Sequence, residues 1–297
     1  MITVNTRILK AEFEYFTPNT IQEALQLLDQ YGSNANLIAG GTDLLVQMKN
    51  EVISPSYLIN IMKISEMIFI KAKEGWLRIG AATKWHEVIE FCAKNQKYAS
   101  LYEASCSLGK VQVRNMGTIG GNLCTASPAA DSAPPLLVFN SRVKLTSVQG
   151  ERIIKLEDFF KGVNATAMAP NEIMTEIQIT SINKGMGSAF MKVTRVGADI
   201  SKISCAVALE RQGNICASCQ IAMGAVATVP LKIEKANGIV VGKKVDASLV
   251  EEMGEKASEE INPITDIRST AEYRRQIVAI LLKDVFWKAW HRAGGDR

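Results

Sequence analysis

The stretch from Arg114 to Asp131, RNMGTIGGNLCTASPAAD, constrains the fold of this chain more than any other. Its only charged residues are the two that end it. Gly117, Gly120 and Gly121 disfavour both an amphipathic helix and a half-buried strand. Such a segment can bring backbone N–H groups close to a bulky anion, with hydroxyl groups turned toward it. The stretch therefore predicts a binding loop.

A second glycine-rich stretch, Leu37–Leu44 (LIAGGTDL), lies one structural unit earlier. A short strand at 36–39 runs into two glycines and a helical pattern resumes at 44–49, the context in which N–H groups converge on a phosphate. Either stretch alone is equally compatible with a tight turn, but two in one chain favour a cradle for a phosphate-bearing cofactor. The candidate residues are glycines that allow close approach (Gly40, Gly41, Gly120, Gly121), threonines that can bond phosphate oxygens (Thr42, Thr118, Thr125), and Asn122 and Asp131, which suit the hydroxyls of a ribose or ribityl chain.

Composition places the chain among ordinary globular proteins. With 297 residues, 47% hydrophobic and 22% charged, it is long enough for two domains. A net charge of +4, without a basic run, gives no support for nucleic-acid binding. The first residues lack the apolar core of a signal peptide, and no apolar run reaches the roughly 18 residues of a membrane helix. We expect a cytoplasmic protein whose six cysteines are free thiols.

Periodicity and turn residues predict mixed helix and strand content, with helix 21–31 beginning at a capping box of Thr20 and Glu23. Further helices are expected at 44–49, 84–93 (capped by Thr83), 101–108, 249–257 and 272–290, and strands at 57–61, 68–73, 76–81, 143–148, 152–156, 172–179, 190–194, 203–211 and 215–223. The turn residues Glu74-Gly75 and Gln149-Gly150 each predict a hairpin between the strands that flank them. A change of composition at 182–185 predicts the boundary between two domains.

Several catalytic and metal-binding patterns are absent from the sequence. It contains neither GxGxxG nor GxxxxGK, which argues against a Rossmann site and a P-loop. His86 and His291 are far apart in sequence and are interpreted as partly exposed surface residues. Cys216 and Cys219 form a lone CxxC in a strand pattern, and we interpret them as core residues because zinc and iron–sulfur sites need about four ligands. We therefore name no catalytic residue and no metal site.

Three stretches resemble the signatures of the FAD-binding subunit of molybdenum hydroxylases, the family of xanthine dehydrogenase, molybdenum-type carbon monoxide dehydrogenase and nicotinate dehydrogenase. They are AGGTDLL at 39–45, the stretch 114–131, and KVTRVGADIS at 192–201; STAEYRRQIVAILLKD at 269–284 is similar to the family's end helix. The resemblance implies an α+β fold. A two-lobed FAD-binding domain of the vanillyl-alcohol-oxidase (PCMH) type would span 1–181, with lobes of about 1–56 and 57–181, and a carbon monoxide dehydrogenase flavoprotein-like C-terminal domain would span 185–292.

The same resemblance implies a set of FAD-binding residues. Backbone groups from Ile38 to Leu44 would wrap the pyrophosphate, Thr118 to Asn122 would form the second wall, and Lys192 would place a positive charge near the isoalloxazine ring. The implied set is Ile38, Ala39, Gly40, Gly41, Thr42, Asp43, Leu44, Leu108, Thr118, Gly120, Gly121, Asn122, Thr125, Asp131, Ile173, Met174 and Lys192. Thr125 and Asp131 would hold ribityl or ribose hydroxyls, and the backbone of Ile173 and Met174 would meet the adenine or its ribose. Relatives often have alanine where this chain has Ser201, Pro where it has Val111, and in some cases Ser where it has Ala130.

The resemblance also implies partners. No cysteine spacing suits a [2Fe–2S] centre and there is no room for a molybdopterin domain, so both would belong to separate subunits of one complex. This chain would be an electron-transfer flavoprotein of a xanthine dehydrogenase-like enzyme, taking electrons from the iron–sulfur subunit onto FAD and passing them to NAD⁺ or another acceptor. Two alternatives stay open: a stand-alone flavin-dependent oxidoreductase of the same fold, and an assembly scaffold that does not bind flavin.

Overall fold

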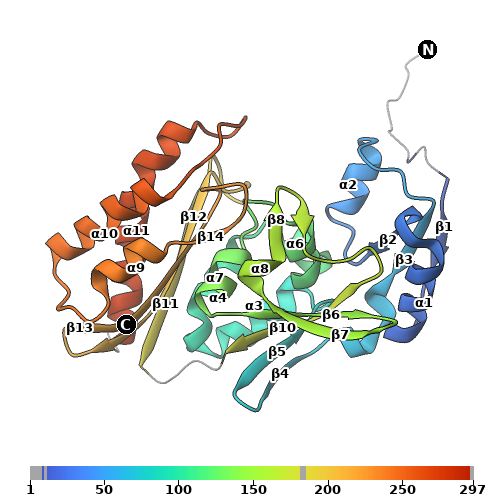
Figure 1. Cartoon of the computed structure of the whole chain (residues 1–297), viewed down its shortest axis with the longest axis horizontal. Helices are drawn as coiled ribbons and strands as arrows, with labels where there is room; N and C mark the ends of the chain where they lie inside the picture. Colours follow the sequence, from blue (N-terminus) through green and yellow to red (C-terminus); the bar gives the residue numbers. More distant parts are fainter. Residues whose placement is uncertain (1–8, 10–11, 181–184, 295–297) are drawn as a thin grey trace.

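The computed structural model describes residue 9, residues 12–180 and residues 185–294. The expected domain boundary at 182–185 lies almost wholly outside these residues. Figure 1 shows three regions side by side: an N-terminal lobe, a central lobe and a C-terminal domain. The described residues combine helices with mainly antiparallel sheets, in the α+β arrangement that the family resemblance implies.

The N-terminal lobe is built on a small parallel sheet of order β1-β3-β2. Its elements are β1 (Glu14–Phe16), α1 (Ile21–Tyr31), β2 (Ala35–Ile38), α2 (Leu44–Lys49) and β3 (Tyr57–Asn60), with a short 3-10 turn at Gly32–Asn34. Helix α1 begins where the capping box predicts, because the N–H of Glu23 donates to Oγ1 of Thr20 at 3.1 Å. Since β3 is the central strand, we propose that this lobe extends through Asn60 rather than ending at residue 56.

The central lobe combines a five-stranded antiparallel sheet, of order β4-β5-β10-β6-β7, with a group of short helices. Its strands are β4 (Ile70–Lys73), β5 (Trp76–Gly80), β6 (Arg142–Ser147), β7 (Gly150–Lys155) and β10 (Ile173–Thr180), with a small hairpin of β8 (Phe160–Gly162) and β9 (Ala165–Thr166). Its helices are α3 (Trp85–Ala93), α4 (Ala99–Ser107), α5 (Val111–Met116), α6 (Ile119–Thr125), α7 (Ala133–Val138) and α8 (Leu156–Phe159), with 3-10 turns at Ile61–Lys63, Ser65–Met67 and Gln96–Tyr98. Both predicted hairpins, at Glu74-Gly75 and Gln149-Gly150, are confirmed.

The C-terminal domain is an antiparallel meander followed by helices. The strands β11 (Met186–Val193), β12 (Ile203–Gln212), β13 (Ile215–Gly224) and β14 (Leu231–Lys232) pair in chain order. The helices are α9 (Glu234–Val240), α10 (Ala247–Glu260) and α11 (Ala271–Ala293).

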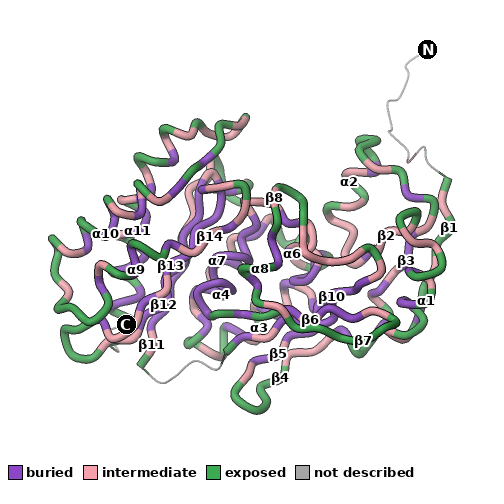
Figure 2. Tube along the Cα trace, in the orientation of Figure 1, coloured by how far each residue is buried: buried purple, intermediate pink, exposed green. Residues whose placement is uncertain are grey.

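Both faces of the C-terminal sheet are covered. Helix α11 packs on β11 and β12, while α4 and α7 of the central lobe pack on the opposite face. Alternate residues of β12 point to different cores: Cys205 and Val207 belong to the core of the C-terminal domain, whereas Ala206 and Ala208 belong to the core of the preceding lobes. Figure 2 shows buried residues running through this junction. The sheet therefore joins the two domains through one continuous apolar layer.

Two local predictions are wrong. Residues 119–125 of the glycine-rich stretch form helix α6, because Oγ1 of Thr118 accepts the N–H of Gly121 and the buried Ile119 and Leu123 anchor one face. The residue before α3 that acts as its cap is Lys84 rather than Thr83. The hydroxyl of Thr83 instead bonds the backbone of Phe69 in both directions, at 3.1 and 3.2 Å.

Candidate cofactor site

A cavity of about 730 Å³ lies where the glycine turn after β2, helix α6 and the start of β10 meet. This size is typical of pockets for cofactors and other small molecules. It is lined by Ala39, Gly40, Gly41, Thr42, Asp43, Leu44, Leu108, Thr118, Gly120, Gly121, Asn122, Thr125, Asp131, Ile173 and Met174. Two residues of the expected set stand outside the lining: Ile38 is buried in a small core with Met48 and Leu58, and Lys192 borders a second cavity.

The glycine turn after β2 offers free backbone donors. Among the hydrogen bonds of the described residues, none is donated by the N–H groups of Gly40, Gly41, Thr42 or Asp43. Gly41 has φ of +69°, a conformation that a side chain would strain. The described lining contains no Lys or Arg, so an anion here would have to be held by these peptide dipoles.

Helix α6 contributes differently from the prediction. Its first N–H groups are already paired, Ile119 to the carbonyl of Thr83 at 3.0 Å and Gly120 to that of Ala81 at 2.9 Å. A Cβ on Gly120 would lie 2.6 Å from that same Ala81 oxygen. Gly120 is therefore needed for the contact between two backbones, and it does not present a free donor to the cavity.

Gly40 has a similar packing role, since a Cβ there would collide with the backbone carbonyl of Met116. Gly121 is different. A Cβ on it would meet only Oγ1 of Thr118, at 2.9 Å, and nothing else within 4 Å. Gly121 is thus the glycine of α6 at which a side chain would take up open space in the cavity.

Two hydroxyl side chains connect the walls. Oγ1 of Thr125 donates at 3.2 Å to the carboxylate of Asp43, which joins α6 to the N-terminal lobe, and lies 3.0 Å from the carbonyl of Gly121. The hydroxyl of Ser132 donates to Oδ1 of Asn122 at 2.5 Å and fixes that amide at the cavity wall.

Asp131 takes part in a buried polar cluster. Its Oδ2 accepts from Nζ of Lys192 at 2.7 Å, and its Oδ1 accepts from the hydroxyl of Ser201 at 2.6 Å. Lys192 also donates to the carbonyl of Asp199 at 3.1 Å. Burial raises the pKa of Asp131, and both Lys192 and Ser201 oppose that increase by bonding the ionised form. Asp131 and Lys192, which we expected to contact the cofactor separately, therefore form one buried ion pair.

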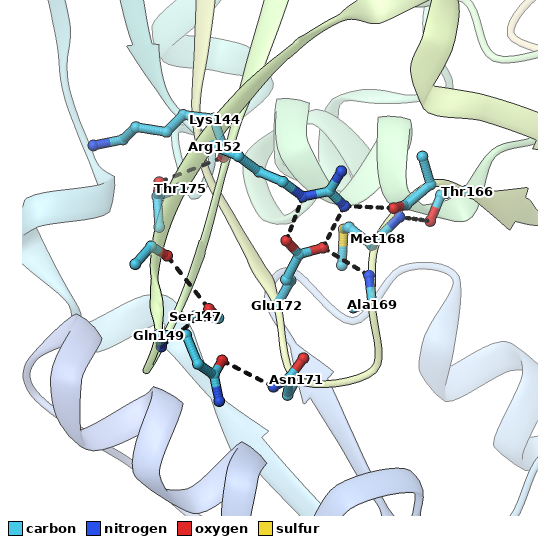
Figure 3. A network of polar contacts seen from close by, with 12 residues as sticks. Lys144, Ser147, Gln149, Arg152, Thr166, Met168, Ala169, Asn171, Glu172 and Thr175 are labelled. Carbon is cyan, nitrogen blue, oxygen red and sulfur yellow. Dashed lines mark hydrogen bonds and ion pairs between the residues drawn. The ribbon is translucent and has the colours of Figure 1, made fainter.

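A loop between β9 and β10 forms another wall, and Figure 3 shows what holds it. Nε and one terminal nitrogen of Arg152 donate to the two oxygens of Glu172 at 2.6 and 2.7 Å, and the same terminal nitrogen donates to the carbonyl of Ala167 at 2.7 Å. Glu172 in turn accepts the N–H of Ala169 at 2.7 Å. The hydrogen bonds from Arg152 hold the pKa of Glu172 below its usual value, so the carboxylate stays ionised.

This loop carries cavity residues that the sequence reading missed, namely Met168, Ala169, Pro170 and Glu172. The sequence signal that could have indicated this loop is Met168-Ala169-Pro170, just before the strand predicted at 172–179. Other missed lining residues lie far apart along the chain, such as Asn36, Trp85, Cys124 and Ile200. Burial raises the pKa of the Cys124 thiol to about 12, so this thiol stays neutral.

The structure also shows the positions of the two cysteines and two histidines to which the sequence analysis assigns no function. Cys216 and Cys219 are buried in the C-terminal core, on the same face because a β-bulge at Glu210/Arg211 displaces the strand register between them. His86 is half-buried and His291 exposed. Within the described ranges no cluster of three or more His, Cys, Asp or Glu residues could hold a metal ion, and no helix is long and apolar enough to cross a membrane.

The cavity fits a dinucleotide such as FAD. It offers unpaired peptide donors at one glycine turn, open space at Gly121, hydroxyl and amide groups beside them, and apolar walls from Leu108, Ile173 and Met174. These are the features that a pyrophosphate, a polyol chain and flat aromatic rings each require.

Comparison with known proteins agrees with this fit. The family described as "FAD binding domain in molybdopterin dehydrogenase" matches residues 11–180, and the "CO dehydrogenase flavoprotein C-terminal domain" matches residues 188–289. The chain is 34% identical to the glyceraldehyde dehydrogenase medium chain of Sulfolobus acidocaldarius, over 93% of this chain and 97% of that one. It is 31% identical to the nicotinate dehydrogenase FAD-subunit of Eubacterium barkeri, over 93% and 95%.

Among solved structures, carbon monoxide dehydrogenase from Hydrogenophaga pseudoflava superposes with a TM-score of 0.93 at 31% identity, covering 96% of this chain and 99% of that one. The expected fold class is thereby confirmed. Taken with the cavity, these matches show that the chain belongs to the FAD-binding medium subunits of the molybdenum hydroxylase family, which are oxidoreductase flavoproteins.

Proposed function

We propose that this chain is the electron-transfer flavoprotein of a heteromeric molybdenum hydroxylase. It accepts electrons from a [2Fe–2S] subunit, a third subunit carries the molybdopterin, and NAD⁺ or another acceptor receives the electrons. One observation carries the proposal: the turn at residues 40–43 lines a cavity of dinucleotide size, its N–H groups donate no hydrogen bond among the described residues, and the described lining has no cationic side chain.

Different residues of the cavity are assigned to different parts of FAD. We assign the pyrophosphate to the N–H groups of residues 40–43 and the hydroxyl of Thr42. Thr125 and Asn122 suit the polyol hydroxyls, and the loop held by Arg152 with Met174 suits the adenine end. The Asp131–Lys192 pair is assigned to the flavin end as a dipole, because each charge is largely cancelled by the other.

FAD, when bound, supplies the redox chemistry, and the chain itself binds, orients and excludes water. We accordingly assign no general acid, base or nucleophile to it. Burial of the Asp131–Lys192 pair keeps bulk water from one wall of the cavity, since both side chains are under 10% exposed.

The hydroxylated substrate is not selected by this subunit. The relatives named above act on glyceraldehyde, nicotinate and carbon monoxide, yet each is 31–34% identical to this chain over nearly its whole length. We place substrate choice in the molybdopterin subunit and keep the complex in the cytoplasm.

An absorption spectrum of the natively purified complex, with its chains separated and its released cofactors identified, tests the proposal. Flavin and iron–sulfur bands, three co-purifying chains and molybdenum are expected. Flavin on this chain alone, reduced by a small molecule without partners, would indicate the stand-alone oxidoreductase. A chain purified without flavin would contradict both.

A further inference from the structure

Helix α5 differs from the other helices around the cavity because none of its six residues is buried. Val111 is 57% exposed, Val113 36% and Met116 53%. The helix is nevertheless held in place: one terminal nitrogen of Arg114 donates to the carbonyls of Leu108 and Gly109 at 3.1 and 2.7 Å. A fixed helix that presents apolar side chains to solvent is typical of an interaction surface.

This helix separates the cofactor cavity from a second cavity of about 740 Å³. Val113 lines the first, while Val111, Gln112 and Arg114 line the second. Gly109 and Ala198 border both. A partner protein bound at the second cavity would therefore be separated from the cofactor cavity by one short helix and one loop.

The charged side chains that line the second cavity are all positive. Its charged lining residues are Lys110, Arg114 and Lys192, and no Asp or Glu lines it among the described residues. Lys192 is cancelled by Asp131, but Arg114 bonds only neutral carbonyls and Lys110 has no ion pair within the described chain. The surface thus combines apolar side chains with two uncompensated positive charges.

We propose that α5 (Val111–Met116), Lys110 and the second cavity form the docking surface for the iron–sulfur subunit, whose matching face is apolar with acidic residues around it. The inference rests on the proposed function, in which that subunit delivers electrons to FAD. Because electron transfer requires the two centres to be close, the donor must dock beside the cofactor cavity, and the second cavity shares Gly109 and Ala198 with it. Met and Arg are enriched in interface cores, and the positive charges match an acidic partner.

Binding of the purified iron–sulfur subunit to the FAD-loaded chain tests this surface. Val111→Glu and Met116→Glu place a charge in the apolar patch and are expected to weaken binding at least tenfold, with the FAD content of the chain unchanged. Lys110→Glu is expected to weaken binding and to reduce its sensitivity to salt. Ile280→Glu is the matched control, because Ile280 lies on α11 and is 55% exposed, and it should bind like the wild type.

The outcomes separate the two hypotheses. Wild-type affinity in both Val111→Glu and Met116→Glu would overturn the docking surface alone. Loss of the molybdopterin subunit, or of self-association, with the iron–sulfur subunit still bound would overturn it as well. An FAD-loaded wild-type chain that binds no iron–sulfur subunit would overturn the proposed function and the docking surface with it.

Discussion

Nζ of Lys192 lies 2.7 Å from Oδ2 of Asp131, so a cation on strand β11 neutralises a carboxylate at the wall of the cofactor cavity. The two residues are 61 positions apart and belong to different domains. Burial raises the pKa of Asp131, which makes its ionised form dependent on Lys192 and Ser201. The cofactor site is therefore completed by the C-terminal domain.

Ser201→Ala tests the hydroxyl group that donates to the carboxylate of Asp131. The change leaves Oδ1 of Asp131 without its 2.6 Å hydrogen bond, and we expect about 1.5 to 3 kcal/mol of stability to be lost, as for a buried bond to a charged group. Denaturant unfolding of the FAD-loaded chain measures it. Ser204→Ala is the matched control because the buried hydroxyl of Ser204 has no partner in the described structure, and it should be nearly neutral. Equal effects in both variants would contradict this role.

Arg152→Gln tests the loop between β9 and β10. Without the guanidinium, the buried carboxylate of Glu172 loses its partner and the loop loses the bond to Ala167. We expect FAD to bind about tenfold more weakly, equivalent to about 1.4 kcal/mol. Flavin fluorescence titration measures the affinity. Lys144→Gln removes a more exposed ion pair from the adjacent strand and should leave the affinity unchanged.

Gly121→Val fills the open side of the cavity. Because only Oγ1 of Thr118 lies near the added Cβ, the chain is expected to fold with at most about 1 kcal/mol lost from the helix cap. Bound FAD, measured by absorbance after gel filtration, should fall to near zero. Gly238→Val makes the same chemical change at an exposed position of helix α9, where nothing lies within 4 Å of the added Cβ, and should keep its flavin. A Gly121→Val chain with one FAD per molecule would refute the placement of the cofactor.

Glu103→Gln tests the polar link between domains and has a defined pH dependence. Burial raises the pKa of Glu103, but hydrogen bonds from Arg292 and Lys288 outweigh it, so the pKa lies below the usual 4.5. A lowered pKa in the folded state means that the carboxylate stabilises the fold at neutral pH and that this contribution disappears as pH falls through the folded-state pKa.

At pH 7 we expect Glu103→Gln to be less stable than the wild type by about 2 kcal/mol, and the difference should shrink below pH 4.5. Thermal unfolding from pH 7 down to roughly two pH units below the usual 4.5 measures the difference, because the contribution is fully lost only below the lowered folded-state pKa. Glu259, paired with Lys256 on the surface, provides the control, and Glu259→Gln should match the wild type throughout. A difference that stays constant with pH would exclude ionisation of Glu103 as the cause.

Local signals in the sequence predicted much of the fold. The capping box of Thr20 and Glu23 determines the start of α1 through contacts three residues apart, and both hairpins follow from their turn residues. Helix α6 escaped prediction because its glycines are poor helix formers, and burial of Ile119 and Leu123 against distant segments outweighs that preference.

The site was predictable where it consists of contiguous sequence and not where it depends on pairing. The two glycine-rich stretches could be found by composition, and most of their residues line the cavity. The ion pairs of Asp131 with Lys192 and of Arg152 with Glu172 join residues that only the folded chain brings together. The unpaired N–H groups of residues 40–43 likewise become visible only when every other backbone partner is known.

The two family domains that follow one another along the sequence share buried core residues. Phe190, Ala206, Ala208 and Ala222 belong to the core of the FAD-binding region although they lie in the C-terminal domain. During synthesis, a nascent chain extending only to residue 181 would expose the apolar faces of α4 and α7 to water and leave Asp131 without a counter-charge. Strands β11 to β13 therefore have to be present before that face is covered and before the carboxylate of Asp131 is paired with Lys192.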